Sequence, residues 1–178
     1  ELGRPLLVHQ IGRDSAPLRL LVVAGQHGDE KFARESETML LASYEKGLLD
    51  SSNLFLSVIP NLNPDGAVAD TRTNAQGIDL NRDHQRLDSR ETRALHAFVR
   101  SFRPHLVVDV HNYPPRRKHL LTKNWVIDQD IFIDVPNHPA IRFSFDMEEL
   151  RSLIGTVRDD LQSQGFSCER YVLVRRVG

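Results

Sequence analysis

The feature that most constrains the fold of this chain is a short segment of almost unbroken apolar character. Leu18–Ala24 (LRLLVVA) is apolar at every position except Arg19. Such a run is typical of a strand that is covered on both faces, as in a parallel sheet. Two further apolar runs, Leu54–Ile59 (LFLSVI) and Leu106–Val110 (LVVDV), predict neighbouring strands of the same kind.

A helix is predicted between the first two of these strands, over residues 29–46. Gly47 follows it and is a common helix-terminating residue. The apolar side of this helix is predicted to consist of Phe32, Met39, Leu40 and Tyr44.

The clearest helical pattern lies at residues 88–103, just before the third strand. Asp88 is the predicted N-cap, and Glu91 stands three residues later, as in a capping box. Pro104 ends the pattern. One apolar stripe is formed by Leu95, Phe98, Val99 and Phe102.

The remaining segments extend the alternation of strands and helices. Further strands are predicted at residues 5–11 and 171–174, and a further helix at residues 147–164. Residues 60–87 are rich in Pro, Asn, Asp and Gly and show no period, so they are predicted to form a long loop. Alternating strands and helices indicate an α/β layered protein.

Composition excludes several classes of protein. The chain has 178 residues, of which 40% are hydrophobic and 26% charged, so it is neither disordered nor fibrous. This length suggests one domain, which we predict to span residues 1–178. The net charge of −1 gives no strong field to attract nucleic acid or a membrane surface. No apolar stretch approaches the roughly 20 residues that span a bilayer.

The cysteine count limits both disulfides and metal ligands. Cys168 is the one cysteine, so an internal disulfide is impossible and a metal site would have to use histidines and carboxylates. The single thiol and the absence of a signal-peptide pattern favour a cytoplasmic location.

Polar residues follow each of the three apolar strands. His27 and Glu30 come after the first, the loop at residues 60–87 after the second, and His111 after the third. In open α/β sheets, ligands bind at the carboxyl ends of the strands. Two imidazoles and one carboxylate can form a catalytic zinc site, although a single histidine at a strand end is more often structural.

Four motifs in this order carry a specific resemblance: GQHGDE, NPDG, TRTNAQGIDLNRD and VVDVHNY. Over about residues 18–113 the sequence resembles the zinc carboxypeptidases of the metallopeptidase M14 family, and in particular their compact bacterial members. The resemblance implies an α/β fold in three layers, in which a mixed, mostly parallel central sheet has helices on both faces.

The resemblance also implies roles for particular residues. One Zn²⁺ ion would be held by His27, Glu30 and His111. Asp79 would accept the other ring proton of His27, as the histidine ligands of metals usually require.

Three further residues are matched to substrate binding by the same resemblance. Arg72 would polarise the scissile carbonyl, a role that suits a fixed positive charge. Asn81 and Arg82 would hold the terminal carboxylate of the substrate, which a planar guanidinium can bind with two hydrogen bonds. Each arginine has a plain alternative as a solvated loop residue.

The family mechanism also requires a glutamate general base well downstream of the third ligand. Glu148 and Glu149 fall in a predicted amphipathic helix, and Glu169 precedes a strand-like run without the expected surroundings. We therefore predict that the base lies beyond Gly178, and that the catalytic domain is incomplete at its C-terminal end.

These features predict a zinc-dependent metallocarboxypeptidase that cuts the C-terminal peptide bond of a substrate with a free carboxylate. One alternative keeps this chemistry and acts on murein peptides or N-acyl amino acids. A second alternative is an inactive metal-binding module that lacks the general base.

Overall fold

The computed structural model describes residues 2–48, 50–113, 129–135 and 146–170. The chain divides into two compact units, residues 1–113 and 114–178, and each is described by itself. Whether both belong to one catalytic domain over residues 1–178 stays a prediction.

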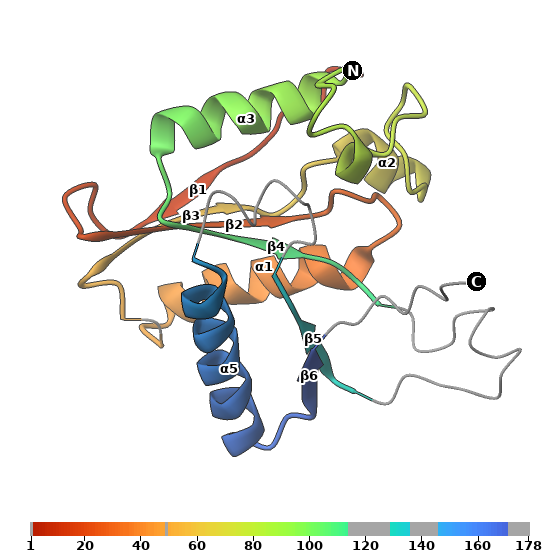
Figure 1. Cartoon of the computed structure of the whole chain (residues 1–178). Helices are drawn as coiled ribbons and strands as arrows, with labels where there is room; N and C mark the ends of the chain where they lie inside the picture. The colour runs from red at the N-terminus through yellow and green to blue at the C-terminus, as the bar shows by residue number, and fades with distance from the viewer. Residues whose placement is uncertain (1, 49, 114–128, 136–145, 171–178) are drawn as a thin grey trace, which may run out of the picture. The chain divides into compact units, whose positions relative to one another are not determined.

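The first unit is built on a four-stranded sheet in the order β1-β3-β2-β4 (Figure 1). Its central strand β2 pairs in parallel with both β3 and β4, whereas β1 pairs antiparallel with β3. The strands are β1 His9–Ile11, β2 Leu18–Ala24, β3 Leu54–Ile59 and β4 Leu106–Val110. The prediction of a mixed, mostly parallel sheet is confirmed, and the carboxyl ends of β2, β3 and β4 meet at one edge.

Helices cover both faces of this sheet (Figure 1). Leu21 and Val23 of β2 point into a core with α3 (Arg90–Phe102), which contributes Leu95 and Phe102. The alternate residue Val22 lies in a second core, against which Leu40 and Leu41 of α1 (Lys31–Glu45) pack. Because neighbouring strand residues point to opposite faces, a continuous apolar run such as β2 requires cover on both sides, and the predicted three layers are confirmed.

The predicted apolar side of α1 is mostly wrong. Phe32, Met39 and Tyr44 are exposed, whereas Ala33 and Glu37 are buried. Successive helical residues are rotated by about 100°, so a sheet-facing stripe through Ala33 and Glu37 turns Phe32 away from the core. Leu40 packs inward as predicted, and the helix ends before Gly47, whose φ of 71° only glycine adopts easily.

Burial of Glu37 has a consequence for stability. Its side chain is 3% exposed, and its Oε2 atom has no hydrogen-bond partner among the described residues. Burial raises the pKa of this carboxyl group to about 7, since a charged carboxylate is disfavoured away from water.

As the pH rises, ionisation of the buried Glu37 carboxyl group lowers the stability of the wild type. We expect Glu37→Gln to abolish this effect. A carboxyl group whose folded pKa is raised binds protons more tightly in the native state, so wild-type stability falls as pH rises from about 4.5 to about 7. The variant should be more stable than the wild type at pH 8 by on the order of 2 kcal/mol, and similar at pH 4.5. Urea unfolding across this range measures the effect, and exposed Glu35→Gln is the control. Parallel pH profiles for wild type and Glu37→Gln would contradict it.

Helix α3 begins one residue later than predicted. The N-cap is Ser89, whose Oγ accepts a hydrogen bond from the backbone N–H of Thr92 at 3.1 Å. Asp88 lies one residue before the cap, and its own N–H donates to Asp83. The predicted apolar stripe is confirmed, and the helix ends at Arg103 in a left-handed conformation just before Pro104.

The segment at residues 60–87 is not a featureless loop. It contains α2 (Pro64–Ala69), capped by the side chain of Asn63, and a 3₁₀ turn η1 (Leu80–Arg82), capped by the side chain of Asp79. These elements are too short to show an apolar period, so the prediction of an irregular loop was wrong here.

The second unit contains α5 (Met147–Ser163), capped by Asp146, and a parallel pair of strands. The strands are β5 (Ile131–Ile133) and β6 (Cys168–Arg170). The helix predicted at residues 147–164 is confirmed, whereas the strand predicted at 171–174 lies outside the described residues. Among the described helices, none is long and apolar enough to cross a membrane.

Candidate metal centre

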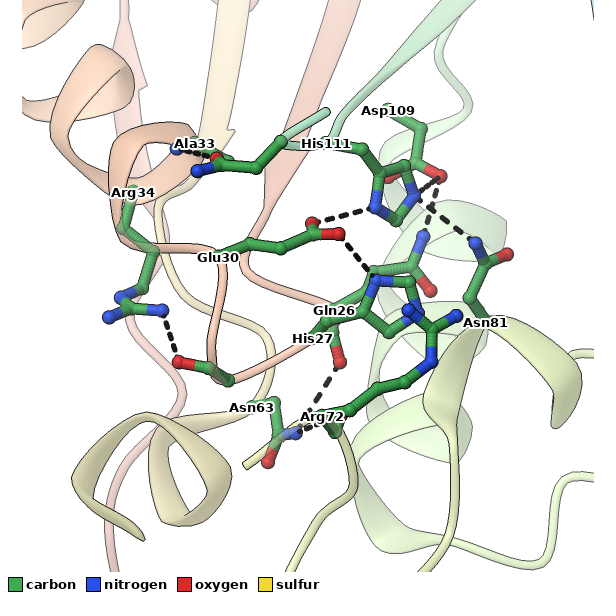
Figure 2. Close-up of polar contacts among 12 residues, drawn as sticks. Gln26, His27, Glu30, Ala33, Arg34, Asn63, Arg72, Asn81, Asp109 and His111 are labelled. Carbon is green, nitrogen blue, oxygen red and sulfur yellow. Dashed lines mark hydrogen bonds and ion pairs between the residues drawn. The ribbon is translucent and has the colours of Figure 1, made fainter. Parts of the chain in front are cut away.

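Three side chains meet at the carboxyl edge of the sheet (Figure 2). His27 follows β2, Glu30 directly precedes α1, and His111 follows β4. Glu30 lies between the two rings: its Oε1 is 2.8 Å from Nδ1 of His27, and its Oε2 is 2.8 Å from Nδ1 of His111. One possible ligand atom from each residue lies within 4.8 Å of the others, so the structure brings together the residues predicted to bind metal.

The electrostatics of this cluster favour the charged form of Glu30. Burial alone would raise the pKa of its carboxyl group, but hydrogen bonds from His111 and His27 outweigh burial and lower the pKa to about 2. His111 responds in the opposite direction. Burial lowers its pKa, but the carboxylates of Asp109 and Glu30 raise it to about 10. Without metal, these carboxylates therefore favour a proton on His111.

Each histidine also contacts a carboxylate through its outer nitrogen. Nε2 of His27 lies 3.1 Å from Oδ1 of Asp79, the contact that the resemblance implied. Nε2 of His111 lies 3.0 Å from Oδ2 of Asp109. Such contacts fix the ring orientation and leave Nδ1 facing the shared centre.

Arg72 is tied to this arrangement through Asp79. Its Nε donates to Oδ2 of Asp79 at 2.9 Å, while Oδ1 of the same carboxylate contacts His27. Burial raises the pKa of Asp79, but the hydrogen bond and charge of Arg72 outweigh it and lower the pKa. One carboxylate thus orients both a candidate ligand and the predicted carbonyl-polarising arginine.

The two residues predicted to bind the substrate carboxylate lie in η1, close to the cluster. Nδ2 of Asn81 is 3.2 Å from Nε2 of His111. Arg82 is exposed, and its Nη1 donates to the backbone oxygen of Asn81 at 2.8 Å. Asn81 therefore contacts the cluster directly, and the role of both residues in substrate binding stays a prediction.

Close backbone packing fixes the loop that carries the first two ligands. A Cβ atom on Gly28 would lie 2.0 Å from the backbone carbon of Gly66, so the loop can approach α2 this closely only because residue 28 has no side chain. The backbone N–H groups of Leu62 and Asn63 donate to the oxygens of Ala24 and Gly25. The ends of β2 and β3 are therefore held together next to the cluster.

The donor set fits a zinc ion. Two imidazole nitrogens and one carboxylate are the protein ligands of many catalytic zinc sites. Both Nδ1 atoms face the Glu30 carboxylate, and both outer nitrogens are held by other carboxylates. Metal binding would replace the protons that these Nδ1 contacts hold in its absence.

Several neighbours of the cluster were not singled out from the sequence. Gln26, His84 and His96 extend the contacts of Asp109, and Asn112 accepts a hydrogen bond from the first turn of α1, at Ala33. Asp109 lies two residues before His111, and this spacing places both side chains on the same strand face. The other contacts join residues far apart in the sequence and leave no local pattern.

The candidate general bases belong to the second unit. Glu148 and Glu149 are exposed in the first turn of α5, as expected for surface acids. Glu169 is exposed on β6. The position of the general base beyond Gly178 stays a prediction.

Comparison with curated proteins finds fungal carboxypeptidases, whereas no family model matches the chain. Carboxypeptidase 2 of Trichophyton rubrum is 24% identical over 164 residues, which cover 89% of this chain and 30% of that protein. The probable carboxypeptidase 2 of Trichophyton verrucosum is 31% identical over 109 residues, covering 58% of this chain and 21% of that protein.

Solved structures of bacterial enzymes share the fold. A metallo-carboxypeptidase from Burkholderia cenocepacia is 28% identical with a TM-score of 0.55, over 62% of this chain and 34% of that one. A metallo-carboxypeptidase from Pseudomonas aeruginosa, in complex with (2-guanidinoethylmercapto)succinic acid, is 26% identical with a TM-score of 0.53, over 68% and 39%. An aspartoacylase family protein from Mesorhizobium loti shows the same fold at 20% identity, with a TM-score of 0.60 over 93% and 55%.

The chain spans about a third or less of the curated carboxypeptidases that it matches. Within this span lie the ordered motifs and the His27, Glu30 and His111 cluster. These relatives and structural neighbours support the resemblance of the chain to the zinc carboxypeptidases of metallopeptidase family M14.

Proposed function

We propose that this chain carries the metal centre of a zinc-dependent carboxypeptidase, with His27, Glu30 and His111 as the ligands. The observation that carries the proposal is the convergence of these three donors within 4.8 Å at the carboxyl edge of the sheet. Arg72 is linked to one of them through Asp79, which brings a fixed positive charge to the same place.

A bound zinc ion supplies a Lewis acid that activates water and polarises a carbonyl group. The protein side chains then bind and orient the peptide. Asp79 fixes Arg72 through Nε, and about half of the arginine side chain (47%) stays exposed for contact with the scissile carbonyl. Preorganised positive charge at this point stabilises the negative charge that develops on the carbonyl oxygen.

End-specificity is assigned to Arg82, together with Asn81. An arginine fork matches a terminal carboxylate with two hydrogen bonds, and an internal peptide bond offers no such partner. Loss of a hydrogen bond to a charged group costs about 1.5–3 kcal/mol. This requirement separates a carboxypeptidase from an endopeptidase.

We expect Arg82→Ala to lower kcat/KM on acyl-dipeptides with a free C-terminal carboxylate by roughly ten- to a hundredfold. Hydrolysis of the matching C-terminal amides should change little, since they lack the carboxylate. Arg86→Ala is the matched control, because Arg86 lies in the same segment, is exposed and pairs with Asp88. An equal loss on acids and amides would refute the assigned role.

The class of substrate is tested with the same metal-loaded protein. The panel contains L-peptides, the substrates of the proposed carboxypeptidase. It also contains murein peptides and N-acyl amino acids, the substrates of the alternative hydrolase. Preferred hydrolysis of L-peptides supports the proposal, and preference for another class replaces it. Bound zinc without hydrolysis of any class would support an inactive metal-binding module.

A further inference from the structure

A chain of hydrogen bonds leads from His111 away from the ligand cluster. Asp109 Oδ2 lies 3.0 Å from Nε2 of His111 and accepts from Nε2 of Gln26 at 2.6 Å (Figure 2). Oε1 of Gln26 is 2.8 Å from Nε2 of His84, whose Nδ1 is 3.2 Å from Nε2 of His96. The chain therefore joins the end of β4 to the end of β2, to the segment after η1 and to α3.

The chemistry of its members fixes the direction of every bond. Gln26 presents its amide nitrogen to Oδ2 of Asp109, which accepts, and its amide oxygen to His84. His84 must then carry a proton on Nε2, and in the neutral ring this leaves Nδ1 to accept from His96. Burial lowers the pKa of His84, in keeping with a neutral ring. In each of these hydrogen bonds, the donor is the residue farther from Asp109.

The members of the chain sit on well-anchored parts of the first unit. Gln26 is 3% exposed, and its backbone oxygen accepts from Nδ2 of Asn63 at 3.4 Å. His84 follows Asp83, a buried residue that holds the start of α3 through three hydrogen bonds. The rings of His84 and His96 stack at 5.4 Å. By contrast, the side chain of Asp109 is 39% exposed.

We propose that Gln26 and His84 are positioning residues that hold the Asp109 carboxylate against His111 and thereby set the zinc affinity of the site. This inference rests on the proposed metal centre. Among the described residues, the Asp109 carboxylate makes hydrogen bonds with Gln26 and with His111 itself. Gln26 is therefore the residue that holds it against His111. Without it, the half-exposed carboxylate turns to solvent, and the His111 ring loses the acceptor that directs Nδ1 toward the metal.

The size of the effect follows from the role of outer partners in metal sites. Loss of such a partner weakens metal binding by roughly 10- to 100-fold. Gln26→Leu removes the amide that bridges Asp109 and His84. His84→Phe keeps a ring of similar shape but removes the donor to Gln26, whereas His84→Gln keeps a donor.

The test measures zinc affinity of the full protein by competition with a chromophoric chelator, well below the melting temperature of each metal-free variant. We expect Gln26→Leu and His84→Phe to weaken zinc binding by roughly 10- to 100-fold. His84→Gln should restore much of the affinity. The control is His9→Phe, because His9 is an exposed histidine on β1 and takes no part in these hydrogen bonds.

A spectroscopic readout separates positioning from a general loss of structure. In long-range ¹H–¹⁵N spectra of the zinc-loaded wild type, His111 should carry its proton on Nε2 in a single ring environment. In Gln26→Leu, this Nε2–H signal should broaden or exchange faster. A merely structural role would lower the melting temperature and leave this signal unchanged.

The possible outcomes distinguish this inference from the proposed function. If the wild type binds no zinc, the metal centre itself fails and the positioning role falls with it. If the wild type binds zinc and both Gln26→Leu and His84→Phe bind it equally well, the positioning role alone is overturned. The double variant should lose no more affinity than Gln26→Leu, because both residues act in series; additive losses would overturn that arrangement.

Discussion

Glu30→Gln is expected to weaken zinc binding by more than about a hundredfold, a larger loss than for an outer partner. The Glu30 carboxylate contacts both histidine rings and is ionised, with its pKa lowered to about 2 by His111 and His27 against the opposing effect of burial. Glutamine has a similar shape but no charge, and it places an NH₂ group against one of the two rings. Chelator competition at neutral pH measures the change.

The same substitution should also destabilise the metal-free protein. Removing one partner of a buried ion pair costs about 3–5 kcal/mol when the remaining charge is left uncompensated. The cost here should be smaller, because His111 keeps the carboxylate of Asp109 and His27 keeps that of Asp79. Glu35→Gln on the exposed side of α1 is the matched control. Unchanged zinc affinity in a folded Glu30→Gln protein would remove Glu30 from the ligand set.

Gly28→Ala is expected to lower stability by about 3 kcal/mol or more, at the upper end of the overpacking range. The added Cβ would lie 2.0 Å from the carbon of Gly66 and 2.4 Å from the nitrogen of Ala67. Both are backbone atoms, so no side chain can rotate out of the way, and the loop must shift. That shift would move His27 and Glu30, so zinc affinity should fall together with stability.

Urea unfolding and chelator competition measure these two effects. Gly155→Ala is the matched control, because Gly155 lies within α5 and a Cβ there meets no atom within 4 Å. Alanine there should increase stability by up to about 1 kcal/mol. A Gly28→Ala protein as stable as the wild type would show that the loop does not pack this closely on α2.

The central sheet could be predicted from sequence because its strands are buried on both faces. β2, β3 and β4 begin and end at the predicted residues, since their apolar runs stop abruptly at Gly25, Pro60 and His111. Parallel pairing then brings their carboxyl ends to one edge. The convergence of His27, Glu30 and His111 follows directly from that topology.

The helical face of α1 could not be predicted in the same way. Its sequence spreads apolar residues around the helix, and Phe32 and Met39 offered as good a stripe as the one that is buried. In the folded protein the side that carries Ala33 and Glu37 packs on the sheet, and tertiary packing rather than the helix sequence determines this side. A buried glutamate has no sequence signal.

The outer part of the site also lay beyond local sequence patterns. Gln26 and Asp109 are 83 residues apart, and Gln26 and His84 are 58 residues apart. Short-range spacing can indicate a pair such as His27 and Glu30, but contacts of this length depend on the fold. The short helix α2 and the turn η1 were missed because their side-chain caps, Asn63 and Asp79, resemble ordinary turn residues.

The most direct test of the metal centre is the zinc content of the purified protein, measured by mass spectrometry for the wild type and for His111→Ala. We expect about one zinc ion per wild-type chain and its loss in the variant, with both proteins folded. A folded wild type without zinc, or a His111→Ala protein that retains it, would contradict the assignment of His27, Glu30 and His111 as the metal ligands.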